Sequence, residues 1–183
     1  MPRTLPAFDT VFKKECSKAL KLTQNMEVIF LSTSNNQNKK IISLQELEYA
    51  YEIAYLRIFV AWEDFLETTL YRLLCGYITP SGAEPLKASC RYFPNIASAE
   101  AAILNGRDYK LWHNPDTVAN RANGILHLSR YETILKSASS DIVHFANVRH
   151  RIVHSQKDAK DKFNTTTVNL CGRRFLAARL VAF

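Results

Sequence analysis

The longest predicted helix lies between Ser43 and Cys75, and it constrains the fold more than any other part of the sequence. No glycine or proline interrupts it, and Gly76 follows directly as a stop signal. Ser43 and Glu46 have the spacing of a capping box, which favours a helix that begins at this serine. Aromatic and aliphatic residues occur around most of the helical circumference, as is typical of a buried helix. The sequence therefore predicts one long central helix over residues 43–75.

Helix breakers are scarce in the rest of the chain too, with five glycines and six prolines among 183 residues. This scarcity favours an all-α fold, which we expect to form a single domain over residues 1–183. An irregular insert is expected over residues 79–126. Apolar spacing and turn residues predict further helices: 6–26, 98–105, a short helix after 114–116, 127–137 and 141–155. Whether the last two are continuous or break at 137–140 is left open.

The C-terminal part of the sequence carries weaker signals. Residues 155–162 alternate lysine and aspartate with few apolar positions, and they are predicted to be a charged loop. The β-branched run over residues 165–170 is predicted to be extended or a short strand. The chain closes at residues 173–183 with the pattern of a short amphipathic helix.

The composition of the chain limits which partners and which cellular compartment can be expected. The chain carries a formal net charge of +7 at pH 7, which favours a polyanionic partner without specifying it. The four cysteines show no metal-ligand spacing and are predicted to be reduced packing residues. No secretory N-terminal pattern occurs and no run approaches the length of a membrane span. We therefore expect a cytoplasmic protein that makes no membrane contact.

Residues 141–155 hold the densest group of chemically useful side chains. Three of the five histidines lie here, with arginines between them. On a helical wheel, His144, His150 and His154 fall on a polar arc. Asn147 and Arg151 lie on the same arc. Arg149 does not, because it falls in the middle of the opposite, apolar arc, where an unpaired charge would cost several kcal/mol on the order expected for a desolvated ion. Arg149 therefore needs a carboxylate, a partner chain or a bound anion.

Two structural interpretations compete with a catalytic one. Arg149 could form a buried ion pair with Glu63 or Asp64, which lie deep in the apolar run of the long helix. His150 and His154, spaced i and i+4, could bind a metal, although no nearby acidic third ligand supports a metal site. No metal or other cofactor is expected.

Residues 149–154 have the form R-x4-H with a polar residue, His150, directly after the arginine. They follow an amphipathic helix and a long buried helix that carries an acidic residue, Glu63. This arrangement resembles the HEPN superfamily of helical domains, whose ribonuclease members carry such a motif. The resemblance covers the order of helices across most of the chain, and it implies an HEPN-like helical bundle.

The resemblance also implies an activity, a metal-independent endoribonuclease of the toxin or defence type that works as a homodimer. His154 would then be the acid–base group, Arg149 would stabilise charge on the scissile phosphate and His150 would orient or assist. Glu63 matches the polar residue that the earlier helix contributes in many members. Asn147 and Arg151 are added as supporting residues from the helical wheel alone. The implied partners are RNA, a second copy of the chain and, for a toxin, a cognate antitoxin.

The chemistry suits these residue types. RNA supplies its own nucleophile, the 2′-hydroxyl, so the enzyme needs a proton acceptor of near-neutral pKa and a fixed positive charge. On an ideal helix, however, Arg149 and His154 lie about 140° apart. Either the helix distorts near His154, or a symmetry mate supplies the missing group. The alternative function is a non-catalytic helical module that binds nucleotide or a protein partner.

Overall fold

The computed structural model describes residues 3–32, 41–107 and 112–174. The chain divides into two compact units. The first unit consists of Met1–Asp9 and Glu63–Ala146, and the second of Thr10–Trp62 and Asn147–Phe183. The prediction of an all-α fold is confirmed for the described residues, since a single pair of two-residue strands accompanies the helices there.

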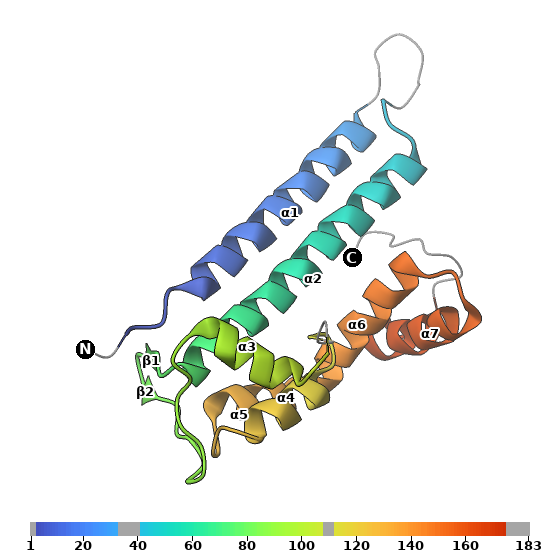
Figure 1. The fold of residues 1–183 in the computed structure, drawn as a ribbon. Helices are drawn as coiled ribbons and strands as arrows, with labels where there is room; N and C mark the ends of the chain where they lie inside the picture. Colours follow the sequence, from blue (N-terminus) through green and yellow to red (C-terminus); the bar gives the residue numbers. More distant parts are fainter. Residues whose placement is uncertain (1–2, 33–40, 108–111, 175–183) are drawn as a thin grey trace. The chain divides into compact units, whose positions relative to one another are not determined.

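The elements follow one another along the chain as labelled in Figure 1. They are α1 (Phe8–Leu31), α2 (Leu44–Leu74), β1 (Ile78–Thr79), β2 (Gly82–Ala83), α3 (Ile96–Leu104), α4 (Pro115–Asn123), α5 (Arg130–Ser137), α6 (Ser139–Val153) and α7 (Lys157–Cys171). The predicted helices over 43–75, 98–105 and after 114–116 correspond to α2, α3 and α4. The predicted pair 127–137 and 141–155 is broken at Ala138 into α5 and α6.

The first unit contains α3, α4, α5 and the C-terminal part of α2. Helices α4 and α5 pack against each other. The core has Leu70, Leu74 and Leu126 with no exposed surface. The Tyr131 hydroxyl donates a 3.0 Å hydrogen bond to the main-chain carbonyl of Leu66, which attaches α5 to α2. Trp112 is buried and meets the ring of Tyr71 edge-on, so it anchors this part of the chain to α2.

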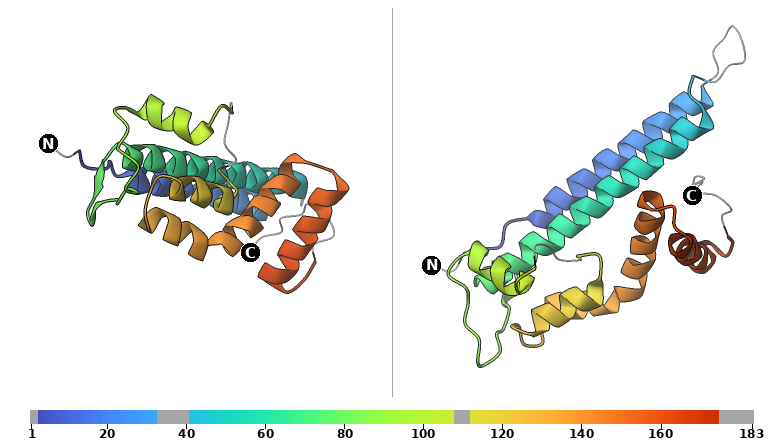
Figure 2. Two further views of the ribbon diagram at one scale, coloured as in Figure 1. Left: turned by 60° about the horizontal axis from the view of Figure 1, so that its bottom comes forward. Right: turned by 45° about the vertical axis from the view of Figure 1, so that its right-hand side comes forward.

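The second unit contains most of α1 and α2, which lie side by side and antiparallel (Figures 1 and 2). The rings of Phe12 and Trp62 pack 6.0 Å apart between them, and the Tyr51 hydroxyl donates to the Glu27 carboxylate. This unit also holds α7 and the end of α6, where the Asn147 amide donates a 3.1 Å hydrogen bond to the Thr166 hydroxyl.

Helix ends agree with the capping signals in the sequence. The Ser43 main-chain N–H donates to the Glu46 carboxylate at 2.7 Å, and the Glu46 N–H donates to the Ser43 hydroxyl at 3.2 Å. These two bonds form the expected capping box of α2. Asn95 and Asn114 cap α3 and α4 by accepting hydrogen bonds from main-chain N–H groups.

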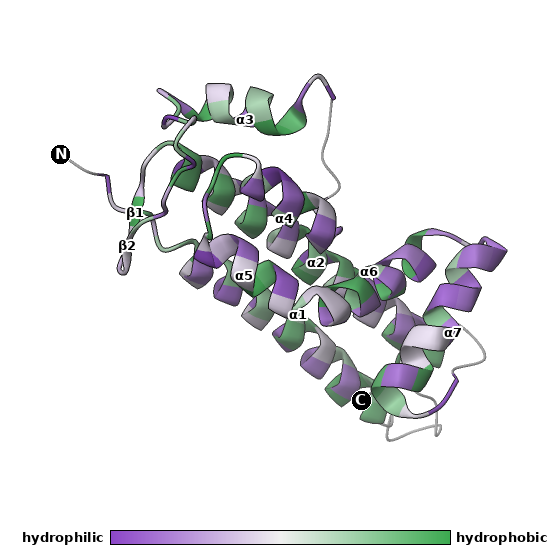
Figure 3. Cartoon of the chain, turned by 90° about the horizontal axis from the view of Figure 1, so that it is seen from below, coloured by the Kyte–Doolittle hydropathy of each residue, from purple (hydrophilic) through white to green (hydrophobic). Residues whose placement is uncertain are grey.

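The prediction for residues 155–170 was wrong. The expected charged loop and extended segment are one helix, α7, with a hydrophilic first half (Figure 3). Charged side chains one turn apart support its start, since Lys162 and Asp158 pair at 2.8 Å. Burial supports its second half, because Thr166 and Thr167 face the core and the Thr167 hydroxyl donates to the Asn164 carbonyl. Tertiary packing thus overrides the β-branched composition.

The helix predicted over 173–183 falls almost wholly outside the described residues. Arg173 and Arg174 follow Gly172 without helical structure. Among the described helices, none has the length and apolar character that crossing a bilayer requires.

Candidate functional site

The predicted motif lies at the C-terminal end of α6. The helix ends at Val153, so Arg149 and His150 are helical and His154 is the first residue beyond it. The His154 main-chain N–H still donates to the His150 carbonyl at 2.9 Å. His154 is exposed, whereas Arg149 and His150 are half-buried. The position of the helix end therefore frees His154 from strict helical geometry.

The structure brings His150 and His154 together. Their ring centroids are 4.6 Å apart and the ring planes are tilted by 47°. Two imidazoles at this distance cannot both carry a proton without strong like-charge repulsion. The nearby His154 ring therefore disfavours the protonated form of His150.

The surroundings of His150 favour the neutral form. Burial lowers its pKa from the ordinary value, and the nearby His154, Lys162 and Arg149 lower it further. Asp158 acts in the opposite direction. His150 can thus act as a proton acceptor at a lower pH than an ordinary histidine. Sequence reasoning missed Lys162 and Asp158 because both were assigned to a loop; their i and i+4 spacing was the available signal.

Arg149 is held against an aromatic ring. Its guanidinium carbon lies 6.0 Å from the centroid of the Phe59 ring on α2. Within the described residues of the second unit, no carboxylate lies within 4 Å of Arg149. A cation–π contact leaves the five N–H donors of the guanidinium available. Arg149 therefore keeps its capacity to bind an anion.

Arg151 and Asn147 fix the local geometry. The Arg151 guanidinium donates a 3.1 Å hydrogen bond to the His154 main-chain carbonyl and so ties the residue after the helix back to α6. Asn147 binds Thr166 and holds α7 against α6. Both residues thus make side-chain hydrogen bonds within the second unit.

Glu52 on α2 is a neighbour that sequence reasoning did not assign to the site. Burial raises the pKa of its carboxyl, and the nearby Glu48 raises it further, while Arg151 lowers it. Glu48 and Glu52 are four positions apart, so helical periodicity places them on the same face of α2.

Glu63, the remaining predicted supporting residue, lies in the first unit. Its carboxylate pairs with the Nδ1 atom of His113 at 3.2 Å, and both side chains are largely shielded from solvent. Asp64, the other acid considered as a partner for Arg149, is exposed. Glu63 thus has a partner within its own unit, and it helps to anchor the segment that contains Trp112.

The described histidines, cysteines and acids form no group of three that could hold a metal ion. The four cysteines are free and half-buried. Comparison of the chain with protein-family models, with curated protein sequences and with solved structures gave no match.

Proposed function

We propose that the chain is a metal-independent endoribonuclease of the toxin or defence type, with His150, His154 and Arg149 as its active-site residues. The observation that carries this proposal is the pairing of two histidine rings, 4.6 Å apart, beside a half-buried arginine on the same helix. The HEPN-like motif over residues 149–154 points to the same chemistry.

The reaction needs one base, one acid and one positive charge. Neutral His150 accepts the proton of the RNA 2′-hydroxyl, and the 2′-oxygen attacks the adjacent phosphorus. The bond from phosphorus to the 5′-oxygen breaks, and protonated His154 donates a proton to that oxygen. The products are a 2′,3′-cyclic phosphate and a 5′-hydroxyl. This assignment gives His150 a larger part than the family pattern does, because burial lowers its pKa.

Arg149 stabilises the charge that develops on the phosphate oxygens. Its guanidinium has the planar donor geometry that matches two phosphate oxygens at once. Its contact with Phe59 restricts the side chain, which reduces the entropy lost when the phosphate binds.

The active form is proposed to be a homodimer. On the arc of α6 predicted to be apolar, Ile142 and Val148 are buried, but Phe145 is 49% and Val153 is 50% exposed. Large apolar side chains that stay exposed next to a charged site favour a contact with another chain. A second copy would bring two basic clusters toward one RNA strand.

Cleavage of RNA by the purified full-length chain in EDTA tests the proposal. The wild type is expected to yield 2′,3′-cyclic phosphate and 5′-hydroxyl ends. The variants His150→Ala, His154→Ala and Arg149→Ala are each expected to lose at least about 100-fold in kcat/KM, a typical effect for general acid–base or charge-stabilising residues.

The matched control is His127→Ala, which removes an exposed histidine far along the chain from the motif and should leave cleavage unchanged. RNA with 2′-O-methyl groups should resist cleavage because it lacks the nucleophile. If the wild type binds RNA without cutting it, or if the three variants cut as well as the wild type, the chain is instead a non-catalytic binding module.

A further inference from the structure

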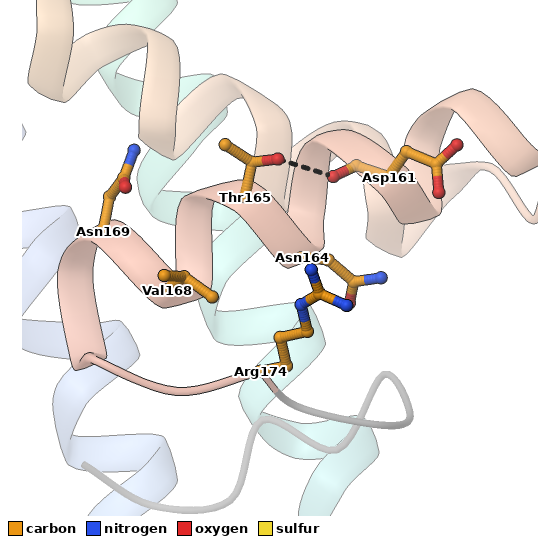
Figure 4. Close-up of a pocket in the computed structure, with 6 residues that line it drawn as sticks. All are labelled: Asp161, Asn164, Thr165, Val168, Asn169 and Arg174. Carbon is orange, nitrogen blue, oxygen red and sulfur yellow. Dashed lines mark hydrogen bonds between the residues drawn. The ribbon is translucent and has the colours of Figure 1, made fainter.

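Two exposed surfaces of the second unit are open to a partner. The outer face of α7 borders a hollow, but its polar side chains do not converge there, since Asp161 and Asn169 lie at opposite ends and point apart (Figure 4). The other surface is a row of apolar side chains on α2, which we name the α2 stripe. The pattern of residues along this stripe points to a partner of a particular kind.

The α2 stripe consists of Tyr49, Ile53, Leu56 and Val60, which follow one another at intervals of four, three and four residues. This is the spacing of the a and d positions of a heptad repeat, with Ile53 and Val60 at a and Tyr49 and Leu56 at d. Tyr49 is 63% and Val60 is 54% exposed, and the two residues between them are half-buried. The stripe is therefore a continuous apolar row along one face of the helix.

The opposite side of α2 supplies the core of the second unit, where Leu47 and Ala54 are buried. Apolar residues thus occupy two faces of this helix, and its own unit buries one of them far more than the other. A row of large apolar side chains in contact with water favours binding to another apolar surface. Because the row has heptad spacing, the surface it fits best is a second helix with the same spacing.

The charged residues beside the stripe are complementary to those of a second copy in parallel orientation. Glu52 occupies a g position and Arg57 the following e position. In a parallel pair, a g residue meets the e residue five positions later on the other helix, so Glu52 meets the partner's Arg57, and the symmetry repeats this ion pair. In an antiparallel pair like flanks meet, so Arg57 faces Ala50 and Glu52 faces Phe59, with no ion pair.

The residue types within the stripe favour the same arrangement. β-branched residues at a with leucine at d favour two-stranded parallel pairs. Ile53 and Val60 are the β-branched residues at a, and Leu56 is the leucine at d. Spacing, flanking charge and residue type therefore agree on one partner.

We propose that α2 pairs in parallel with α2 of a second copy of the chain, through the α2 stripe and through ion pairs between Glu52 and the partner's Arg57. This names the contact surface of the homodimer and to that extent rests on the proposed function. The g flank of the stripe borders the motif, because Phe59, the next g residue, contacts Arg149. The partner's Arg57 thus adds a positive charge on the side of α2 that faces the motif.

Charge reversal in separate chains tests the proposal by sedimentation equilibrium. Arg57→Glu and Glu52→Arg each place like charges opposite one another, so each variant alone should dimerise about tenfold more weakly than the wild type. Mixed in equal amounts, the two variants regain opposite charges at both sites and should form a mixed dimer with about wild-type affinity. Lys21→Glu reverses an exposed charge on α1 and should leave the dimer unchanged.

A cysteine at a d position tests the orientation. In a parallel pair the two copies of residue 56 face each other, so Leu56→Cys should cross-link into a dimer under mild oxidation, faster than the wild type with its four native cysteines. In an antiparallel pair residue 56 faces residue 53 of the partner. A Leu56→Cys dimer that does not cross-link therefore overturns the parallel arrangement.

Two further results overturn the proposal. One is a wild-type chain that is monomeric at micromolar concentration, which would mean that residues 175–183 of the same chain or another protein cover the stripe. The other is a dimer that neither charge reversal weakens. Because association is measured without RNA, a dimer of this kind that cuts no RNA would refute the nuclease alone, and a dimeric nuclease unaffected by both reversals would refute this interface alone.

Discussion

At the scale of single residues, the chemistry proposed for this chain depends on how two imidazoles differ. His150 is half-buried on the helix and His154 is exposed just beyond it. Burial lowers the pKa of His150, with Lys162 lowering it further and Asp158 raising it. These two α7 residues therefore offer a way to move the pKa of His150 in opposite directions without touching the motif.

The pH dependence of RNA cleavage should follow this pKa. If neutral His150 is the base, kcat/KM rises with pH through its folded-state pKa, so the midpoint of the acidic limb lies below about 6.5, the ordinary histidine value. Lys162→Ala removes a cation and should move the midpoint upward, whereas Asp158→Asn removes an anion and should move it downward. Both profiles are measured from initial cleavage rates. Shifts of the same sign in the two variants would contradict the assignment of His150 as base.

At the scale of elements, two helix caps illustrate how burial determines how much a capping hydroxyl contributes to the stability of the fold. Ser129 caps α5 and has no exposed surface, and its hydroxyl accepts from the Glu132 N–H at 3.1 Å. Ser43 caps α2 in the same way but is exposed. Water can replace the hydroxyl of Ser43 but not that of Ser129.

Alanine substitutions at the two caps should therefore differ. Ser129→Ala is expected to lower the free energy of unfolding by about 1–2 kcal/mol, and Ser43→Ala by about 0.5–1 kcal/mol. Urea denaturation followed by circular dichroism measures both. A loss for Ser43→Ala equal to or larger than that for Ser129→Ala would contradict the argument from burial.

Much of the helical structure could be predicted because its signals are local. The capping box at Ser43 and the turn at Asn114 act through neighbouring main-chain groups, so spacing alone reveals them. Helix α7 could not be predicted in this way. Its threonines favour a strand locally, and the burial of Thr166 and Thr167 against the second unit's core, which local spacing does not reveal, favours the helix instead.

The residues of the motif could be predicted from the sequence, but the relative positions of their side chains could not. Spacing identified Arg149, His150 and His154, yet an ideal wheel separates the first from the last by about 140°. The helix end at Val153 removes that constraint, and no local stop signal such as glycine or proline marks it. Glu63 also could not be assigned from sequence, because its partner His113 is fifty positions away.

At the scale of the whole molecule, a chain with a net charge of +7 is expected to bind RNA in a salt-dependent way, and the number of phosphate contacts sets how steep that dependence is. Each phosphate contact releases counterions, so RNA affinity should fall linearly with salt concentration on a double logarithmic plot. If Arg149 contacts a phosphate, Arg149→Gln should reduce the slope by about 0.7 for single-stranded RNA. Arg107→Gln, an exposed arginine of the first unit, serves as the control. Equal slopes for wild type and Arg149→Gln would contradict a phosphate contact.

The proposed dimer predicts complementation between inactive chains. If each site takes Arg149 from one chain and the histidines from the other, mixing Arg149→Ala with His154→Ala after unfolding and refolding should restore about a quarter of wild-type cleavage, because half of the molecules are mixed and each has one intact site. Sedimentation at micromolar concentration should show two chains. A monomer there would contradict the dimer, and an inactive mixed dimer would place the whole site within one chain.

Because α6 stops at Val153, the two motif rings are held by unequal means: His150 by a continuous helix, and His154 by one main-chain bond and the Arg151 guanidinium. An insertion upstream of His150 would move both rings together and leave their relative position unchanged. One extra residue between the two histidines would rotate them apart by about 100°. The interval 150–154 is therefore the stretch of this chain whose length can change least if the pair is to survive.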